Sequence, residues 1–396
     1  MREPAFTLTA GPTMASPRVL AALGSPITYD YDPVFLERFK SLERKLADLY
    51  RTRGDVVLMQ GEAVLGLEAA ARALVRPGTT AINLVSGVYG KWFGLWLRDF
   101  GAELVEVEVP YNESVDPGEL ERAFREHPDA TLVAFVHSET PSGTLNPAQE
   151  LGRVAKEHGA LVIADVVSSL GCEELRPDDW GLDVCVAGPQ KCLAGPPGMS
   201  LMTVSEDAWV AIRANPEAPR GSFLSLLDWK ERWIDGGRTA FPYTPSVSDV
   251  NGVEAACDEI LELGLDQSIE LHRRAARATR AGVKAMGLDL WARTEEIAAS
   301  CVTAVTTPEG VDTLALLAHV REHYGVMLSP GYGELKERLV RLGHMGPAAH
   351  SLNPVVAVAA LGRGLADLGV SVAVGDGAEA TLAVLAEPLG TVAQHA

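Results

Sequence analysis

The sequence is poor in positive charge and lacks any apolar run long enough for a membrane helix. Its 396 residues contain 34 Lys and Arg against 53 Asp and Glu, which gives a formal net charge of −19. A chain this acidic, without a Lys/Arg run, is repelled by a phosphate backbone, so we expect no nucleic-acid partner. No apolar stretch approaches the roughly 18 residues that cross a bilayer, so we expect no membrane partner.

Cysteine is scarce, and we expect no metal site from cysteine or histidine. The five cysteines are Cys172, Cys185, Cys192, Cys257 and Cys301. Their odd number and the lack of a CxxC pair argue against a disulfide framework or a zinc site. We therefore expect reduced thiols, a cytoplasmic location and no metal.

Short β-rich runs alternate with helical patterns from residue 55 to about residue 210. Strands are expected in TTAINLV, ELVEVEV, TLVAFVH, ALVIADVV, DVCVAG and SLMTVS, with helices such as KWFGLWLRDF, PGELERAFREH and PAQELGRVAKEH between them. This alternation predicts an α/β fold with a mainly parallel sheet sandwiched by helices.

Long helical patterns follow, from about residue 248 to residue 285, and lead to a smaller α+β unit. We expect three parts: an N-terminal segment (1–20), a large α/β domain that binds cofactor and substrate (21–265), and a small C-terminal α+β domain (266–396).

Two expected strand ends carry side chains suited to chemistry on a carbonyl compound. ALVIADVVSS places Asp165 at a strand end, and VCVAGPQKCLAGPPG places Lys191 just past the next strand. Ligands of open α/β sheets bind at the carboxyl ends of the strands. A partly buried lysine loses proton affinity and becomes nucleophilic, while an aspartate can keep a pyridine nitrogen protonated. Taken singly, each residue could instead be structural.

Four motifs occur in the order in which one enzyme family has them. HSETPSGTLNP (137–147), IADVVSSLG (163–171), GPQKCLAGPPG (188–198) and RLGHMG (341–346) resemble the class V aminotransferases of the fold-type I pyridoxal-phosphate superfamily. The resemblance covers nearly the whole chain, from LTAGPTMASPRVL near the start to the motif at 341–346. It implies an aminotransferase with an α/β large domain and a smaller C-terminal domain.

The resemblance also assigns roles around a pyridine ring. Lys191 would form a Schiff base and move a proton between the C4′ carbon of the ring compound and the α-carbon of the substrate. Asp165 would pair with the ring nitrogen, Val167 would press on one ring face, and Tyr89 would stack on the other. Two further cofactor-binding residues are expected in the same motifs, namely Thr140 and Gln190.

Other segments imply a carboxylate site and a second subunit. Arg341 matches the family's carboxylate-binding arginine, which can hold an α-carboxylate through two parallel hydrogen bonds. In SPGYGELKERLVR, where a second arginine would be expected, Tyr332 stands instead and leaves the choice of oxo acid open. FPYTPSVSDVNG resembles the segment that reaches a neighbouring subunit's site, so Tyr243 and Thr244 would act there in a homodimer or homotetramer. Read without the resemblance, this segment is a turn bracketed by prolines.

The turn in VVLMQGEAVLGLEAAARAL, residues 56–74, departs from the ordinary pattern of the class. A glycine turn before a helix usually binds phosphate, because free N–H groups and the helix dipole face the ligand. Ordinary members carry small uncharged residues there, whereas this sequence has Glu62. A carboxylate about 4 Å from another unit charge costs roughly 4 kcal/mol at an effective dielectric of about 20. We interpret Glu62 as a residue that selects an unphosphorylated ring; a solvent-facing Glu62 is the alternative.

These features resemble the branch of the class in which pyridoxal and pyridoxamine are substrates rather than a resident cofactor. The expected reaction interconverts pyridoxamine and pyruvate with pyridoxal and L-alanine, in a setting of vitamin B6 breakdown. The main alternative is a conventional alanine- or serine–glyoxylate-type aminotransferase that holds pyridoxal phosphate tightly. A desulfurase or lyase would need a reactive cysteine on a mobile loop, whereas Cys301 begins an expected strand. A non-catalytic binding module would have no need of the Lys191 amine.

Overall fold

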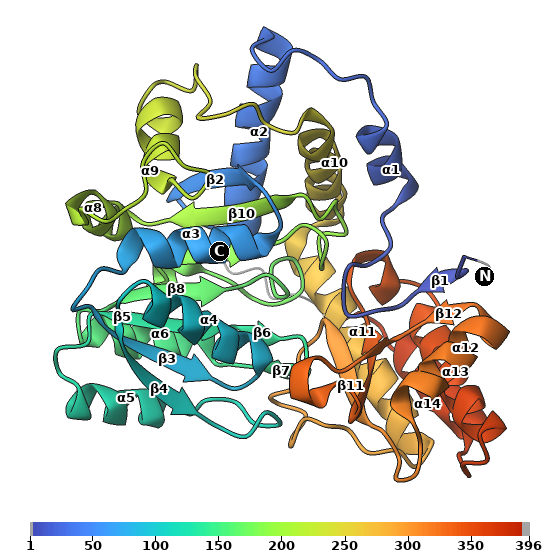
Figure 1. Ribbon diagram of the computed structural model, residues 1–396. Coiled ribbons are helices and arrows are strands. Elements are labelled where there is room, and N and C mark those ends of the chain that lie inside the picture. The colour runs from blue at the N-terminus through green and yellow to red at the C-terminus, as the bar shows by residue number, and fades with distance from the viewer. Residues whose placement is uncertain (1–2, 390–396) are drawn as a thin grey trace.

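The computed structural model describes residues 3–389, which form two packed cores. The larger core surrounds a seven-stranded sheet, and the smaller one surrounds a three-stranded sheet with its own helices. The two units lie side by side in Figure 1, with the long helix α11 (Leu265–Ala285) on the side of the smaller one. The expected α/β class with a mostly parallel sheet and a smaller C-terminal unit is confirmed.

The seven-stranded sheet carries the strand ends on which the site is built. Its order is β2-β10-β9-β8-β5-β3-β4, and β10 alone runs antiparallel to its two neighbours. The strand bounds are Asp55–Gln60 (β2), Thr80–Val85 (β3), Glu103–Glu108 (β4), Leu132–Val136 (β5), Leu161–Asp165 (β8), Val184–Ala187 (β9) and Met199–Val204 (β10). Most of these strands are buried along their whole length, because helices cover both faces.

Helices α3 and α4 cover one face of this sheet, while α2, α5 and α6 cover the other (Figure 1). The bounds are Pro33–Tyr50 (α2), Ala63–Leu74 (α3), Val88–Asp99 (α4), Pro117–Glu126 (α5), Ala148–Glu157 (α6), Pro177–Trp180 (α7), Glu206–Ala214 (α8), Leu226–Asp228 (α9) and Val247–Leu263 (α10). A π-helical stretch spans Trp229–Ile234. Several helices begin as their sequences predict: α2 has Asp32 as N-cap and Pro33 at its first position.

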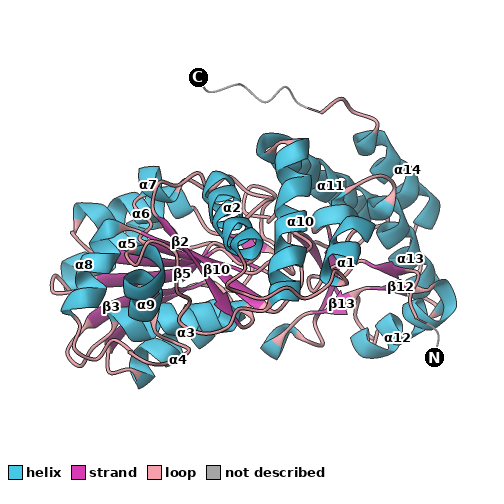
Figure 2. Ribbon diagram, turned by 90° about the horizontal axis from the view of Figure 1, so that it is seen from above, coloured by secondary structure: helices cyan, strands magenta, loops and turns pink. Residues whose placement is uncertain are grey.

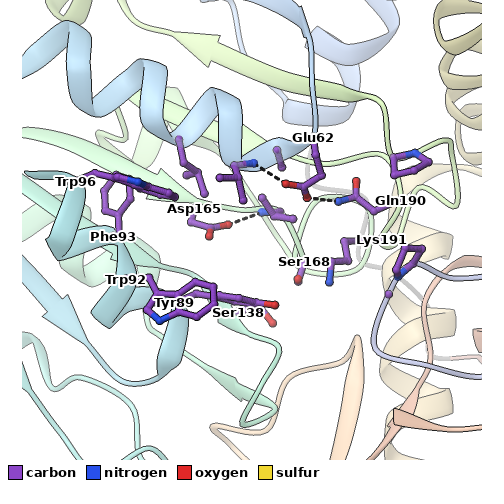
Figure 3. A pocket seen from close by; sticks show the side chains of 17 residues that line it. Glu62, Tyr89, Trp92, Phe93, Trp96, Ser138, Asp165, Ser168, Gln190 and Lys191 are labelled. Carbon is purple, nitrogen blue, oxygen red and sulfur yellow. Dashed lines mark hydrogen bonds between the residues drawn. The ribbon is translucent and has the colours of Figure 1, made fainter. Parts of the chain in front are cut away.

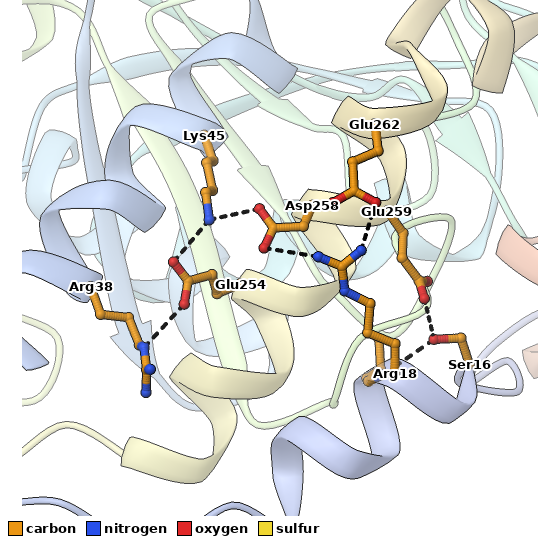
Figure 4. Close-up of polar contacts among 9 residues, drawn as sticks. Ser16, Arg18, Arg38, Lys45, Glu254, Asp258, Glu259 and Glu262 are labelled. Atoms are coloured by element: carbon orange, nitrogen blue, oxygen red, sulfur yellow. Dashed lines mark hydrogen bonds and ion pairs between the residues drawn. The ribbon is translucent and has the colours of Figure 1, made fainter.

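Ion pairs fasten the first two helices of the chain to α10 (Figure 4). Arg18 of α1 (Pro17–Leu23) lies 2.6 Å from Glu262. Lys45 of α2 lies 2.9 Å from Glu254 and 2.6 Å from Asp258. These ion pairs hold α1 and α2 against α10 in the large unit.

The smaller unit is built on an antiparallel sheet of order β11-β14-β13. Its elements are Val302–Thr306 (β11), Ser329–Pro330 (β13), Leu339–Gly343 (β14), Thr313–Tyr324 (α12), Asn353–Asp367 (α13) and Val374–Leu385 (α14). Short 3-10 helices lie at Gly333–Leu335 and Gly346–Ala349. Seen from above in Figure 2, helices α11, α13 and α14 lie together at this end of the molecule.

The N-terminal segment packs with the smaller unit, a feature that the sequence pattern did not predict. Strand β1 (Phe6–Thr7) pairs in parallel with β12 (Val326–Met327), and Leu8 belongs to the core of the smaller unit. Near residue 265, the expected boundary, Gly264 with φ of +94° separates α10 from α11. The assignment of three domains stays a prediction, and its outermost residues, 1–2 and 390–396, lie outside the described range.

Candidate active site

A cavity of about 290 Å³ lies at the carboxyl ends of the parallel strands, between α3 and α4 (Figure 3). Six of the residues singled out from the sequence line it, namely Glu62, Tyr89, Asp165, Val167, Gln190 and Lys191. They come from four separate stretches of the chain, which the fold brings together around one cavity.

Asp165 is the last residue of β8, and its carboxylate is buried at the cavity wall. Its Oδ1 accepts a hydrogen bond of 2.9 Å from the Val167 N–H. Burial raises the pKa of Asp165 to about 7, against the lowering effects of the Val167 N–H and of Lys191. A protonated pyridine nitrogen would supply the positive partner that this buried carboxylate lacks.

Lys191 lies in the tight turn after β9, with its amine in the cavity and only 8% of the residue exposed. Its Nζ donates a 2.9 Å hydrogen bond to the carbonyl of Ala10, in the N-terminal segment. A Cβ at Gly11 (φ +92°) would lie 2.5 Å from the lysine Cδ, so this close approach requires glycine. Burial, and next the positive charge of Arg341, lower the pKa of Lys191, which favours a neutral, nucleophilic amine.

Aromatic side chains of α4 form one wall of the cavity. Tyr89, Trp92, Phe93 and Trp96 follow one another at helical spacing and all face it (Figure 3). Burial raises the pKa of Tyr89 to about 12, so its phenol stays neutral. Tyr332, which is 41% exposed, does not line the cavity but packs against this wall, with ring centroids 5.2 Å from Trp92 and 5.9 Å from Tyr89.

Glu62 caps α3 and points its second carboxylate oxygen at Gln190 (Figure 3). Its Oε2 accepts from the Val64 N–H at 2.8 Å, and its Oε1 accepts from Gln190 Nε2 at 2.5 Å. The other amide atom, Gln190 Oε1, is buried without a hydrogen-bond partner among the described residues. The turn therefore presents a fixed carboxylate, which can accept a hydrogen bond from a donor group on the ligand.

This arrangement fits a pyridine ring with a neutral hydroxymethyl substituent better than one with a phosphate. The Val64 N–H that would contact a phosphate already binds Glu62. An O–H group could instead donate to the Glu62 carboxylate. The residues thus fit the ring of the family's cofactor but not its phosphate.

Arg341, the expected carboxylate ligand, lies buried in β14 with 8% exposure. Its Nε donates to the carbonyl of Pro330 at 2.5 Å, and its Nη1 donates to the carbonyl of Thr140 at 2.9 Å. These bonds fix the plane of the guanidinium. Thr140 itself is buried and bonded to Ser168 at 2.7 Å, so it reaches the site through Arg341 and does not line the cavity.

Like Thr140, Arg341 and Tyr332, the expected residues Tyr243 and Thr244 do not line this cavity. The hydroxyl of Tyr243 accepts from Trp229 Nε1 at 3.3 Å and from the N–H of Gln60 at 3.4 Å, and its ring stacks on Phe223. Thr244 is exposed. Their assignment to a neighbouring subunit's site stays a prediction.

Several residues of the site were not predicted from the sequence. The wall formed by Trp92, Phe93 and Trp96 was readable from the spacing of aromatics after Tyr89. The contact from Ala10 could not be predicted from the sequence, because it depends on where the N-terminal segment passes the carboxyl ends of the strands.

Within residues 3–389, no three His, Cys, Asp or Glu side chains are grouped so that they could hold a metal ion. Across the same residues, no helix has the length and apolar character that a bilayer crossing needs.

Comparison with known proteins adds independent information. Residues 10–336 match the family described as aminotransferase class V. A pyridoxamine–pyruvate transaminase of Mesorhizobium japonicum is 45% identical over 383 residues, which cover 97% of each chain. The crystal structure of pyridoxamine–pyruvate aminotransferase from Mesorhizobium loti matches with a TM-score of 0.94 at 45% identity, covering 97% of each chain. That of ureidoglycine–glyoxylate aminotransferase from Bacillus subtilis matches with a TM-score of 0.92 at 26% identity, covering 98% of this chain and 100% of the other.

The buried Asp165 carboxylate predicts a pH-dependent cost in stability. Its pKa of about 7 lies above the value of about 3.9 in an unfolded chain, so the folded state holds the proton more tightly. Stability therefore falls as the pH rises from about 4 to 7, by up to about 4 kcal/mol at roughly 1.4 kcal/mol per pKa unit. Asp165→Asn should raise the melting temperature at pH 8 by several degrees, and this gain should vanish toward pH 4.

Asp183→Asn is the matched control for this measurement. Asp183 is also buried but is paired with Lys156 at 2.9 Å, so its substitution should lower the melting temperature at pH 8. Equal melting curves for wild type and Asp165→Asn at pH 8 would contradict the assignment of an uncompensated charge to Asp165.

Proposed function

The chain belongs to the class V aminotransferase family, and from that premise we propose that it interconverts pyridoxamine and pyruvate with pyridoxal and L-alanine. Pyridoxal and pyridoxamine are then substrates that enter and leave, and no pyridoxal phosphate is held permanently. Support comes from the relative of that activity at 45% identity and from the site itself.

The observation that carries this proposal is the Glu62 carboxylate in the turn before α3. It occupies the N-cap position, uses the Val64 N–H, and is held toward the cavity by Gln190. A phosphate placed there would meet a negative charge instead of free N–H donors. A hydroxymethyl group could donate a hydrogen bond to this carboxylate.

The side chains divide the remaining tasks. A bound pyridine ring supplies an electron sink for the chemistry at its C4′ substituent. Asp165 holds the ring nitrogen protonated, and Tyr89 and Val167 enclose the ring. Lys191 forms a Schiff base with pyridoxal and carries the proton between the α-carbon of the amino acid and C4′.

Arg341 binds the carboxylate of the amino or oxo acid. Since two carbonyls already orient its guanidinium, little conformational entropy is lost when a carboxylate binds its remaining N–H groups. Tyr332 at the rim offers a hydroxyl but no second positive charge, which suits a small monocarboxylic acid such as pyruvate.

We place this reaction in vitamin B6 breakdown in the cytoplasm, carried out by a homodimer or homotetramer with shared sites. The five cysteines are buried free thiols, as is usual in a reducing compartment. Tyr243 and Thr244 lie outside their own chain's cavity, which leaves them available to a partner.

A first prediction concerns turnover without phosphorylated cofactor. Protein stripped of any bound chromophore should convert pyridoxamine and pyruvate to pyridoxal and L-alanine, which absorbance and amino-acid analysis would measure. Glu62→Ser should shift the ratio of dissociation constants by two to three powers of ten toward pyridoxal phosphate, because about 4 kcal/mol of repulsion is removed. Activity only after addition of pyridoxal phosphate would instead favour a conventional aminotransferase with a resident cofactor.

A second prediction separates binding from chemistry at Lys191. Lys191→Ala should reduce turnover below detection while still binding pyridoxamine, because the ring contacts of Asp165 and Tyr89 remain. Equilibrium dialysis and the transamination assay measure the two effects. Wild-type turnover in this variant would refute the role of the amine.

A third prediction concerns a site shared between subunits. Thr244→Arg, at an exposed position, should inactivate the enzyme without unfolding it. When chains carrying Thr244→Arg and Lys191→Ala are co-expressed, one intact site forms in each mixed dimer. Random pairing should then restore about a quarter of wild-type activity. Full activity of Thr244→Arg alone would show that the site does not include this residue.

A further inference from the structure

Glu139 is a buried carboxylate beside the site to which no role has been given so far. It is 0% exposed and lies in the short strand β6 (Ser138–Glu139), which pairs with β7 (Thr144–Leu145). No ion pair with it is found among the described residues. A fully buried glutamate without a positive partner is rare unless other groups stabilise its charge.

The partners of Glu139 are backbone N–H groups in the first turn of α4. Its Oε1 accepts from the Gly90 N–H at 2.6 Å, and its Oε2 accepts from the Tyr89 N–H at 3.3 Å. Gly87, at the N-cap position, supplies no side-chain cap of its own. Glu139 thus caps α4 from a strand about fifty positions away in the sequence, where the helix dipole favours a negative charge.

The backbone around Glu139 is shaped to admit this side chain. A Cβ at Gly87 would lie 2.5 Å from the Glu139 Cδ, and a Cβ at Gly90 would lie 3.3 Å from Oε1. Burial raises the pKa of Glu139 to about 8, while the Gly90 and Tyr89 N–H groups lower it. Each oxygen faces a different N–H donor, which suits the ionised form, because a protonated oxygen would direct its own O–H at a donor.

We propose that Glu139 is a positioning residue: by capping α4 it fixes Tyr89 against the ring of the substrate. The N–H that it binds belongs to Tyr89 itself, so a shift of this turn moves the stacking ring directly. The inference rests on the proposed function in one respect, namely that a pyridine ring is the ligand of Tyr89.

Binding of pyridoxal to Glu139→Gln, Tyr89→Ala and the double variant tests this proposal. The glutamine keeps the size but turns an NH₂ group toward one N–H, so the dissociation constant should rise about tenfold. If Glu139 acts through Tyr89, the double variant should bind within about threefold of Tyr89→Ala alone. Unchanged binding by Glu139→Gln, or losses that multiply in the double variant, would overturn the proposal.

Glu173→Gln is the matched control, because Glu173 is also buried and accepts from a backbone N–H, that of Ser300, which unlike Tyr89 does not line the cavity. It should keep wild-type affinity for pyridoxal. Should Glu139→Gln fail to fold, Glu139→Asp replaces it: the shorter carboxylate keeps the charge but cannot reach both N–H groups, and wild-type affinity there would also overturn the proposal. Failure of the wild type to bind pyridoxal would count against the proposed function instead.

Discussion

The burial of the Lys191 amine is the constraint on which the rest of the site depends. A lysine amine in this position needs a fixed acceptor and a close enclosure, and the chain supplies both from distant segments. Ala10 offers its carbonyl, Gly11 leaves room for the lysine stem, and Arg341 adds a positive charge that lowers the pKa of the amine. These contacts require the N-terminal segment and strand β14 to lie at the carboxyl ends of the parallel strands of the large sheet. The pairing of β1 with the smaller unit is therefore part of the active-site construction.

The ionisable groups in and beside the cavity are mostly acidic. Glu62, Asp165 and Glu139 provide three carboxyl groups, whereas Arg341 provides one guanidinium and Lys191 an amine whose pKa is lowered. Asp165 is suited to a ring cation and Arg341 to a carboxylate, so both ends of the substrates find complementary charge. The remaining carboxylates face backbone N–H groups at the starts of two helices, α3 and α4. Helix termini that bind anionic ligands in many α/β enzymes are occupied here by the protein's own side chains.

Most of the fold and part of the site could be predicted from the sequence. The buried strands are short apolar runs between helical patterns, and the position of Asp165 at a strand end follows from that reading. Lys191 was identified because charge is rare in such a context, and Glu62 because it breaks a known turn pattern. Glu139 and Ala10 escaped notice, since their partners lie far away in the sequence and no local pattern marks them. Contacts between the large and the small unit depend on tertiary packing, so no periodic pattern in the sequence indicates them.

Under the proposed function, a ring compound is a substrate in a family whose ordinary members hold a related ring as a resident cofactor. A cofactor is retained when many N–H donors and a helix dipole hold its phosphate. A hydroxymethyl group that donates to a carboxylate gains only about 1.5–3 kcal/mol per hydrogen bond. Under the proposed function, the ring would be held by Asp165, by the faces of Tyr89 and Val167, and by a covalent bond to Lys191 that forms and breaks in each cycle. Pyridoxamine would lack that bond, so only non-covalent contacts would hold it and it could leave. A helix-capping glutamate in place of a phosphate site would thus link the choice of ligand to its release.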